Sequence, residues 1–215
     1  MRESLLDLLG PPPADGRSRM PMLGVGVVSN NDGDEKLGHI RVRLPWLGDD
    51  VESMWARIAA PMAGDQRGTW FLPEVGDEVL IGFVRGDTAL PVVLGSLWSE
   101  ADKPPATSSD ERKNVRIIKS RSGHVVRLDD TEGAEKIEII DKQSNSIVFD
   151  AANNKITIHA ASDITITSDK GKIAISGASV EIESTQGAVK ITSAQNMTIQ
   201  AGPSMALKAG MIDLN

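Results

Sequence analysis

The sequence predicts an all-β protein in which an N-terminal barrel precedes a C-terminal β-helix. Residues 20–99 alternate short apolar strands with turns rich in Gly, Asp, Asn and Pro, a pattern typical of small barrels. From residue 137 onward, triplets with apolar first and third residues recur about every eight residues, which indicates a stacked β-solenoid. We therefore expect four segments along the chain: 1–19, 20–99, 100–113 and 114–215.

The first segment, residues 1–19, carries an apolar cluster made of Leu5, Leu6, Leu8 and Leu9. A cluster this short does not fold alone, so we predict that it docks on a partner, with a frayed terminus as the alternative. The segment has neither the apolar core nor the cleavage site of a secretory signal. Assembly in the cytoplasm, without a signal peptide, is therefore expected.

The barrel segment, residues 20–99, contains strands on either side of the polar loop 30–36 and a further strand around residues 53–63. Residues 68–98 are expected to give a strand, the turn Pro73–Gly76, a second strand, the turn Gly86–Asp87 and a last strand. All the tryptophans fall in this segment: Trp46, Trp55, Trp70 and Trp98. Because the chain has a net charge of −7, we expect these rings to pack in the core or between copies instead of stacking nucleic-acid bases.

The linker, residues 100–113, is polar and contains Pro104 and Pro105. Beyond it, the first and third residues of each triplet share one face of a strand, and the middle residue faces water. The predicted apolar core consists of Ile156, Ile158, Ile164, Ile166, Ile173, Ile175, Val180, Ile182, Val189, Ile191, Met197 and Ile199.

The number of chains around that core follows from the height of the stack. The strands of one chain would wind into a stub of roughly 15 Å, whereas three interwound copies would reach roughly 48 Å and leave strand edges only at the ends. We therefore favour a homotrimer, with a single-chain solenoid as the alternative. The last residues read as an unfinished strand that a tip protein can cover: Met211, Ile212, Asp213, Leu214 and Asn215.

Catalytic and ion-binding signals are weak. Loop 30–36 is acidic, but Arg41 stands where an EF-hand loop needs its closing Glu. Asp129 and Asp130 fall in a turn, and no phosphate-binding loop, nucleophile elbow or cysteine is present. The histidines are scattered and are expected at the surface: His39, His124 and His159. We expect no enzyme activity, no cofactor and no metal, the alternatives being a polysaccharide-active solenoid enzyme and an OB-type nucleic-acid-binding module.

Residues 20–99 resemble the OB-fold domain of contractile phage tail spikes, the baseplate assembly protein V family, and of VgrG proteins. The resemblance lies in the stretches GVGVVSNNDGDEKLGHIRVRLPWL, WARIAAPMAG, GTWFLPEVGDEVLIGF and GDTALPVVLGSLW. The repeats are also similar to that family's triple-stranded intertwined β-helix. The resemblance implies a homotrimeric spike of a phage tail or tail-like injection particle. Its N-terminal end would meet a hub or tube-initiator protein, and its C-terminal end would carry a PAAR-like tip protein that touches the target membrane.

The chain departs from that family in three ways. Only the short linker 100–113 stands where some relatives insert a lysozyme domain, so wall-degrading activity is not expected. Only 19 residues precede the barrel, which implies that the hub is a separate protein. The His-x-His motif of metal-binding spike tips is missing, so no iron site is expected at the tip.

Overall fold

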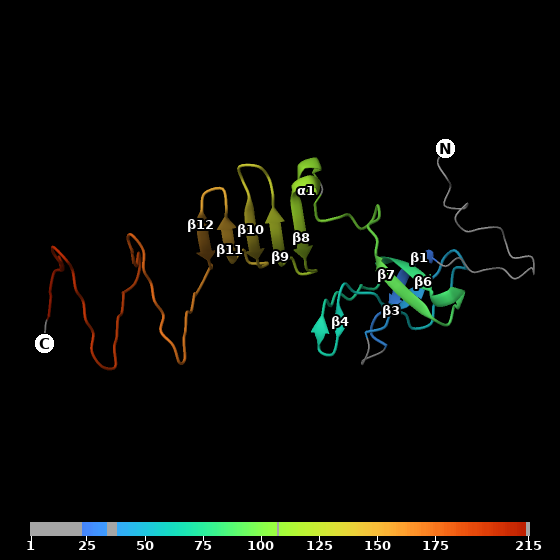
Figure 1. Cartoon of the computed structure of the whole chain (residues 1–215), viewed down its shortest axis with the longest axis horizontal. Coiled ribbons are helices and arrows are strands. Elements are labelled where there is room, and N and C mark those ends of the chain that lie inside the picture. Colours follow the sequence, from blue (N-terminus) through green and yellow to red (C-terminus); the bar gives the residue numbers. More distant parts are fainter. Residues whose placement is uncertain (1–22, 34–37, 107, 214–215) are drawn as a thin grey trace, which may run out of the picture. The chain divides into compact units, whose positions relative to one another are not determined.

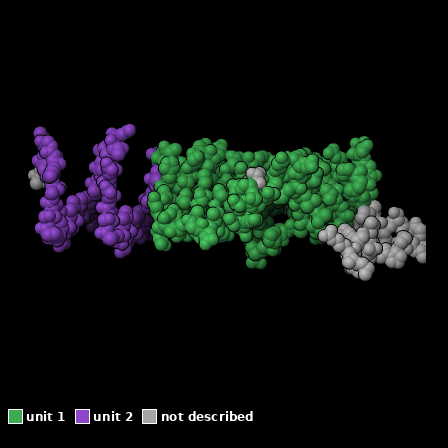
Figure 2. All heavy atoms as spheres, turned by 90° about the horizontal axis from the view of Figure 1, so that it is seen from above, with its two compact units in different colours: residues 1–162 green, residues 163–215 purple. Residues whose placement is uncertain are grey.

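The computed structural model describes residues 23–33, 38–106 and 108–213 and is almost entirely β, as predicted. The chain divides into two compact units, residues 1–162 and residues 163–215 (Figure 2). The first unit contains two separate five-stranded sheets and a short hairpin (Figure 1). Each sheet is described here by itself.

The first sheet curls into the barrel that the sequence predicted, with the strand order β2-β1-β6-β7-β3. Its edges are joined by isolated bridges that link Ile40 to Ala56 and Arg43 to Glu52. The neighbours are antiparallel except for β3 and β7, which run parallel. This order and the curled sheet are those of an OB-fold. The strands are β1 (Leu23–Asn30), β2 (Arg41–Arg43), β3 (Arg57–Ile58), β6 (Glu78–Phe83) and β7 (Pro91–Ser96).

The barrel core is aliphatic and follows the alternation of its strands. On β6, Val79 and Ile81 are fully buried and Phe83 is nearly so, while the residues between them face the other side. The remaining buried apolar residues of this core are Val28, Ile40, Val42, Leu44, Ala56 and Val93. Gly26 on β1 is also buried, and its lack of a side chain lets β2 approach β1 closely.

One expected strand is absent from the barrel segment. Residues 69–72 form no strand, although their apolar side chains suggested one, and Trp70 and Phe71 remain 69% and 64% exposed. The chain forms a small hairpin just before them, from β4 (Ala63–Gly64) and β5 (Arg67–Gly68). The turn before β6 is present as predicted: the Glu74 N–H donates to Asp77 Oδ2 at 2.8 Å. A 3-10 turn at Val84–Gly86 connects β6 to β7.

The expected linker 100–113 contains the start of a helix, α1 (Ser109–Asn114). Ser108 caps this helix: its Oγ accepts the Glu111 N–H at 3.1 Å, and the Glu111 carboxylate accepts the Ser108 N–H at 3.3 Å. The end of the segment expected as a linker thus contains a short helix. The signal was visible in the sequence, because Ser followed three residues later by Glu is a capping box.

The second sheet is an antiparallel meander with the order β12-β11-β10-β9-β8 (Figure 1). Each strand pairs with the next strand of the same chain, because the turns between them are closed by their own side chains. Asp141 Oδ1, for example, accepts the backbone N–H groups of Gln143 and Asn145 at 2.8 and 2.9 Å. The strands are β8 (Val115–Lys119), β9 (Val125–Asp129), β10 (Lys136–Ile140), β11 (Ser146–Asp150) and β12 (Lys155–His159).

The second unit differs from this meander. Its described residues, 163–213, contain no strand paired within the chain. Two of its corners have the same geometry: Ser168 Oγ accepts the Gly171 N–H, and Ser184 Oγ accepts the Gly187 N–H, both at 3.2 Å. The repeat thus has regular corners, but its strand-like segments have no partner among the described residues of the chain.

Candidate functional site

The meander β8–β12 has two chemically different faces, which its register defines. In an antiparallel pair, residues directly opposite each other lie on the same face. Ile137 lies opposite Leu128 on one side and Phe149 on the other, and Phe149 in turn lies opposite Ile156. Ile139, Ile147 and Ile158 form a second row of this kind. All these residues therefore share a single apolar face.

This apolar face is uncovered in the single chain. Ile137 is 45% exposed and Ile139 is 47% exposed, although both lie on the central strand. The apolar face comprises Ile118, Val126, Leu128, Ile137, Ile139, Ile147, Phe149, Ile156 and Ile158, each at least 36% exposed. Contiguous apolar surface of this kind on a soluble protein marks an interaction site.

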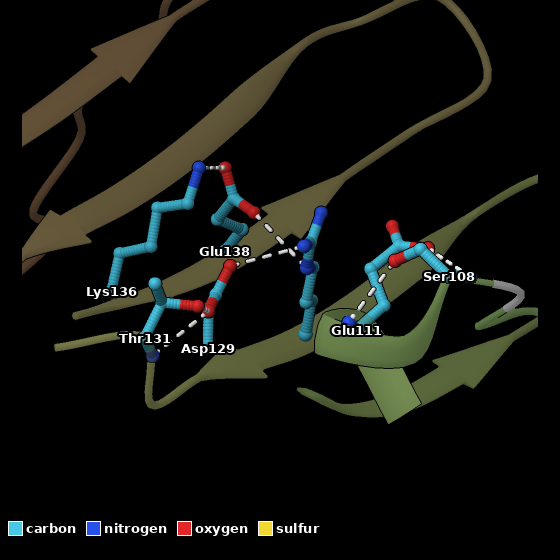
Figure 3. A network of polar contacts seen from close by, with 7 residues as sticks. Ser108, Glu111, Asp129, Thr131, Lys136 and Glu138 are labelled. Carbon is cyan, nitrogen blue, oxygen red and sulfur yellow. Dashed lines mark hydrogen bonds and ion pairs between the residues drawn. The ribbon is translucent and has the colours of Figure 1, made fainter. Parts of the chain in front are cut away.

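The opposite face carries a charged network, seen in Figure 3. Arg127 forms ion pairs with Asp129 at 3.0 Å and with Glu138 at 3.8 Å, and Lys136 pairs with Glu138 at 3.1 Å. Asp129 and Glu138 are only 7% and 9% exposed. The pair between Arg127 and Glu138 joins β9 to β10, whereas the other two each lie within one strand. Because Arg127 and Glu138 lie opposite each other on the face away from the apolar residues, their pair favours the register that keeps the apolar side chains together.

Asp129 is stabilised as a carboxylate in this network. Its Oδ1 accepts the Thr131 hydroxyl at 2.6 Å and the Thr131 N–H at 3.1 Å. The hydrogen bond from the Thr131 side chain is the main reason that the pKa of Asp129 lies below its usual value, and Arg127 and Lys136 act in the same direction. In the turns that follow, the Asn145 amide lowers the pKa of Asp141 and the Asn153 amide lowers that of Asp150.

The predicted core residues continue the apolar pattern beyond the meander. Ile156 and Ile158 lie on the apolar face, and His159 lies on the opposite one, as predicted. The other predicted core residues, in the second unit, are all exposed in the single chain, from 47% for Met197 to 73% for Ile175. Whether they form a common core with other copies stays a prediction.

The structure describes only part of the two ends predicted to dock on partner proteins, the C-terminal residues 211–215 and the N-terminal leucines. At the C-terminal end, Met211 is 86% and Ile212 is 50% exposed, and Asp213 is exposed as well. Leu214 and Asn215 fall outside the described residues. The N-terminal leucines predicted to contact a hub also fall outside them: Leu5, Leu6, Leu8 and Leu9.

The tryptophans are less buried than the sequence suggested. Trp46 packs edge-on against Phe83 with ring centroids 6.5 Å apart, and the guanidinium of Arg41 lies 4.8 Å from the centre of the Trp55 ring. Trp70 and Trp98 are 69% and 67% exposed. The prediction that the rings pack in the core of the chain is therefore wrong for Trp70 and Trp98. Whether these two rings contact another copy stays a prediction.

The described residues bring together no group of three or more His, Cys, Asp or Glu side chains that could hold a metal ion. His124 and Asp141 line the same hollow of the meander, and His124 is one of the groups that lower the pKa of Asp141. Within the described ranges, no helix has the length and apolar character needed to span a membrane. The expectations of no enzyme activity, no cofactor and no metal stay predictions.

Comparison with known proteins decides the nature of the barrel. Residues 24–98 match the family described as the Type VI secretion system/phage-baseplate injector OB domain. The match covers these 75 of the 215 residues, and the name injector OB domain is used for this matched region. The injector OB domain contains the whole five-stranded barrel apart from Leu23, the first residue of β1.

VgrG proteins are among the relatives of the injector OB domain and its flanking sequence. The chain is 31% identical over 140 residues to the Type VI secretion system spike protein VgrG4b of Pseudomonas aeruginosa, covering 59% of this chain and 17% of that protein. It is 28% identical over 111 residues to the spike protein VgrG3 of Vibrio cholerae, covering 48% and 11%. It is also 28% identical over 108 residues to the actin cross-linking toxin VgrG1 of Vibrio cholerae, covering 46% and 10%.

The matched regions are small parts of these relatives, since the chain spans at most 17% of the three. The resemblance to the VgrG-like baseplate spike family that the sequence indicated is nevertheless confirmed. The injector OB domain is thus assigned from both its strand order and its sequence.

Proposed function

We propose that this chain is a structural spike of a secretion or injection system, in which three copies wrap residues 115–213 around a common apolar axis. The observation that carries the proposal is the uncovered apolar face of β8–β12. Burying an exposed Ile or Phe side chain stabilises a protein by about 1.5–3 kcal/mol. A chain that leaves a whole row of them in water gains this energy only when a partner covers them.

The second unit supports the same assembly. Its triplets continue the apolar pattern of β12, but they have no paired strand among the described residues of this chain. An unpaired strand needs partners for its N–H and C=O groups, and neighbouring copies supply both these groups and an apolar face. The injector OB domain and the spike-protein names of the relatives favour this reading over other oligomers.

A matched pair of substitutions on β12 tests the proposal. Ile158 lies on the apolar face and Thr157 on the opposite face, one residue away. In a lone chain, Ile158→Asp would be tolerated because the side chain is 58% exposed. In the proposed assembly it places a charge in the common core, and a charge buried without a partner is strongly unfavourable.

Light scattering on the purified protein gives the readout. We expect the unaltered chain and Thr157→Asp to have three times the mass of the 23.0-kDa chain, and Ile158→Asp to dissociate or aggregate. A stable monomer for the unaltered chain, or equal behaviour of the two variants, would refute the trimer.

The finer parts of the proposal concern partners and place. A tip protein of the PAAR type would cover Met211 to Asn215, a hub or tube-initiator protein would bind the N-terminal end, and the assembled needle would pierce the target envelope. We propose assembly in the cytoplasm and a mechanical, non-enzymatic role for this chain. Loss of tip-protein binding on deletion of residues 211–215, with the trimer intact, is the expected result for that end.

A further inference from the structure

Strand β12 ends the meander with an open edge. It is the last strand in the sheet order and pairs with β11 on one side, so its other side has no strand partner among the described residues. Its three central residues, 156–158, are β-branched and uncharged, whereas the outer strand at the opposite end, β8, carries Arg116 and Lys119. Charged side chains discourage further pairing at a strand edge. The edge of β12 is therefore the end at which this sheet can accept another strand.

The same chain carries a candidate for that place a short distance further on. The triplet at residues 164–166 follows β12 after only the four residues 160–163. The turns inside the meander contain between four and six residues, so this length suffices for one more hairpin. Nevertheless, the described residues 163–213 contain no strand paired within the chain. The length of the connection therefore does not explain why the meander stops at β12.

Two features of the meander turns are missing after β12. Each of the four turns contains one residue with a positive φ, which allows a tight reversal of the chain: Gly123, Gly133, Ser144 and Asn154. Each turn also begins with a side-chain oxygen that accepts a backbone N–H of the turn, from Ser120, Asp129, Asp141 and Asp150. Residues 160–163 have no positive φ, and the first of them is Ala160, whose side chain cannot accept a hydrogen bond.

Asn145 holds the segment that leaves β12. Its Oδ1 accepts the Ala161 N–H at 2.8 Å. The Asn145 side chain is fixed in place because its Nδ2 donates to Asp141 Oδ2 at 2.7 Å, and the Asn145 N–H donates to Asp141 Oδ1 at 2.9 Å. The chain that leaves β12 is thus fastened to the β10–β11 turn, and its Ala161 N–H is not free to close a turn of its own.

We propose that Asn145 ends the meander by holding Ala161, and that it thereby keeps the edge of β12 free for residues 164–166 of a second copy. The proposal rests on the proposed trimer. It adds to the trimer the strand edge at which two copies join and the residue that prevents one chain from occupying its own edge.

The triplet of a second copy fits this edge. Ile164 and Ile166 alternate with Thr165 in the same way as Ile156 and Ile158 alternate with Thr157, so both isoleucine pairs can face one apolar core. When the two triplets pair centre to centre, Thr157 and Thr165 lie directly opposite each other, whether the strands run parallel or antiparallel.

A disulfide between Thr157→Cys and Thr165→Cys tests which chain occupies the edge. The chain has no cysteine of its own, and opposite residues on neighbouring strands have Cα atoms about 4.5–5.5 Å apart, a distance that a disulfide can span. We expect the double variant, refolded from urea and then oxidised, to give covalent dimers and trimers on a non-reducing denaturing gel. Each single variant should remain monomeric on that gel.

Asn145→Ala tests the holding residue, and Asn153→Ala is its matched control. Asn153 also donates its amide to the aspartate that begins its turn, Asp150, at 3.0 Å, and its hydrogen bonds among the described residues stay within that turn. In the double-cysteine chain, Asn145→Ala should raise the ratio of intrachain to interchain disulfide about two- to tenfold, the effect of losing one hydrogen bond. Asn153→Ala should leave this ratio unchanged.

The possible outcomes separate this proposal from the trimer itself. Light scattering first gives the mass of the unaltered chain. If that chain is trimeric, an intrachain disulfide as the main product, or no disulfide at all, would overturn the assignment of the β12 edge and leave the proposed function standing. Equal ratios for Asn145→Ala and Asn153→Ala would overturn the role of Asn145. A monomeric mass for the unaltered chain would refute both the trimer and this proposal.

Discussion

Gly26 has no side chain, which allows β2 to pack closely against β1 in the barrel. Replacing Gly26 with a larger residue tests this packing. A Cβ atom at this position would lie 2.4 Å from Val42 Cγ1 and 2.6 Å from the carbonyl oxygen of Arg43. The Val42 side chain can rotate away from the new Cβ atom, but the Arg43 carbonyl oxygen belongs to the backbone and moves only if β2 moves. Gly26→Ala therefore overpacks the core, at a cost of about 1–3 kcal/mol.

The net loss of stability in Gly26→Ala is smaller than this packing cost. Alanine also reduces the conformational entropy of the unfolded chain, which stabilises the folded state by about 0.4–1 kcal/mol. With the cost at its upper end, since the clash includes backbone, we expect Gly26→Ala to lower the free energy of unfolding by about 2 kcal/mol. Gly95 on β7 is the control, because a Cβ atom there meets nothing within 4 Å. Gly95→Ala should be neutral or stabilise by up to about 1 kcal/mol.

Urea unfolding followed by tryptophan fluorescence measures this difference in the barrel alone, because all the tryptophans lie between residues 46 and 98. At a slope of about 1–2 kcal/mol per molar urea for a domain of this size, the midpoint of Gly26→Ala should fall by about 1–2 M. Both variants are compared at one protein concentration, since oligomerisation shifts apparent stability. A midpoint for Gly26→Ala equal to or above that of Gly95→Ala would refute the packing argument.

Two further substitutions test local features of the barrel and the meander. Gly76 has a φ of +103°, a conformation that L side chains rarely adopt, and a Cβ atom there meets nothing within 4 Å, so Gly76→Ala should lower the urea midpoint relative to Gly95→Ala, where the space is also empty and φ is not positive. Equal midpoints for the two variants would mean that backbone strain at Gly76 contributes nothing. In the meander, the Thr131 hydroxyl is the main reason that the pKa of Asp129 is lower in the folded than in the unfolded chain. The Asp129 carboxylate therefore stabilises the folded chain above the unfolded pKa of about 3.9, and this stabilisation is lost as the pH falls through the lower pKa of the folded chain. Thermal unfolding of Asp129→Asn by circular dichroism should show lower stability at pH 7 and a weaker loss between pH 4 and pH 2 than the unaltered chain, and parallel pH profiles would contradict this role.

Much of the barrel was predictable because its strands alternate. Val79, Ile81 and Phe83 on β6 follow a period of two, and the turns on either side carry Gly and Asp. The failure at residues 69–72 has a physical cause: Trp70 and Phe71 are large and apolar, which suggested a buried strand, yet they stay exposed. An apolar run alone does not tell whether a strand is buried by its own chain.

The candidate site was predictable in part. The triplet rule correctly placed Ile156 and Ile158 on one face of β12, because side chains in any strand alternate. The ion pair between Arg127 and Glu138 was missed, since only the register of the β9–β10 hairpin places these two residues opposite each other.

The pairing of β9 with β10 gives the proposed trimer a starting point. Because the backbone ladder and the ion pair between Arg127 and Glu138 hold this hairpin in one register within a single chain, the β8–β12 meander offers its apolar face before another copy arrives. The described residues 163–213 have no paired strand of their own, so in the proposed trimer they gain strand partners only on association. In this order of assembly, three chains would associate first through β8–β12 and then along the repeats toward Asp213. A substitution that disrupts the apolar face of β8–β12 would therefore prevent assembly, whereas the same substitution near Asp213 would leave most of the trimer formed.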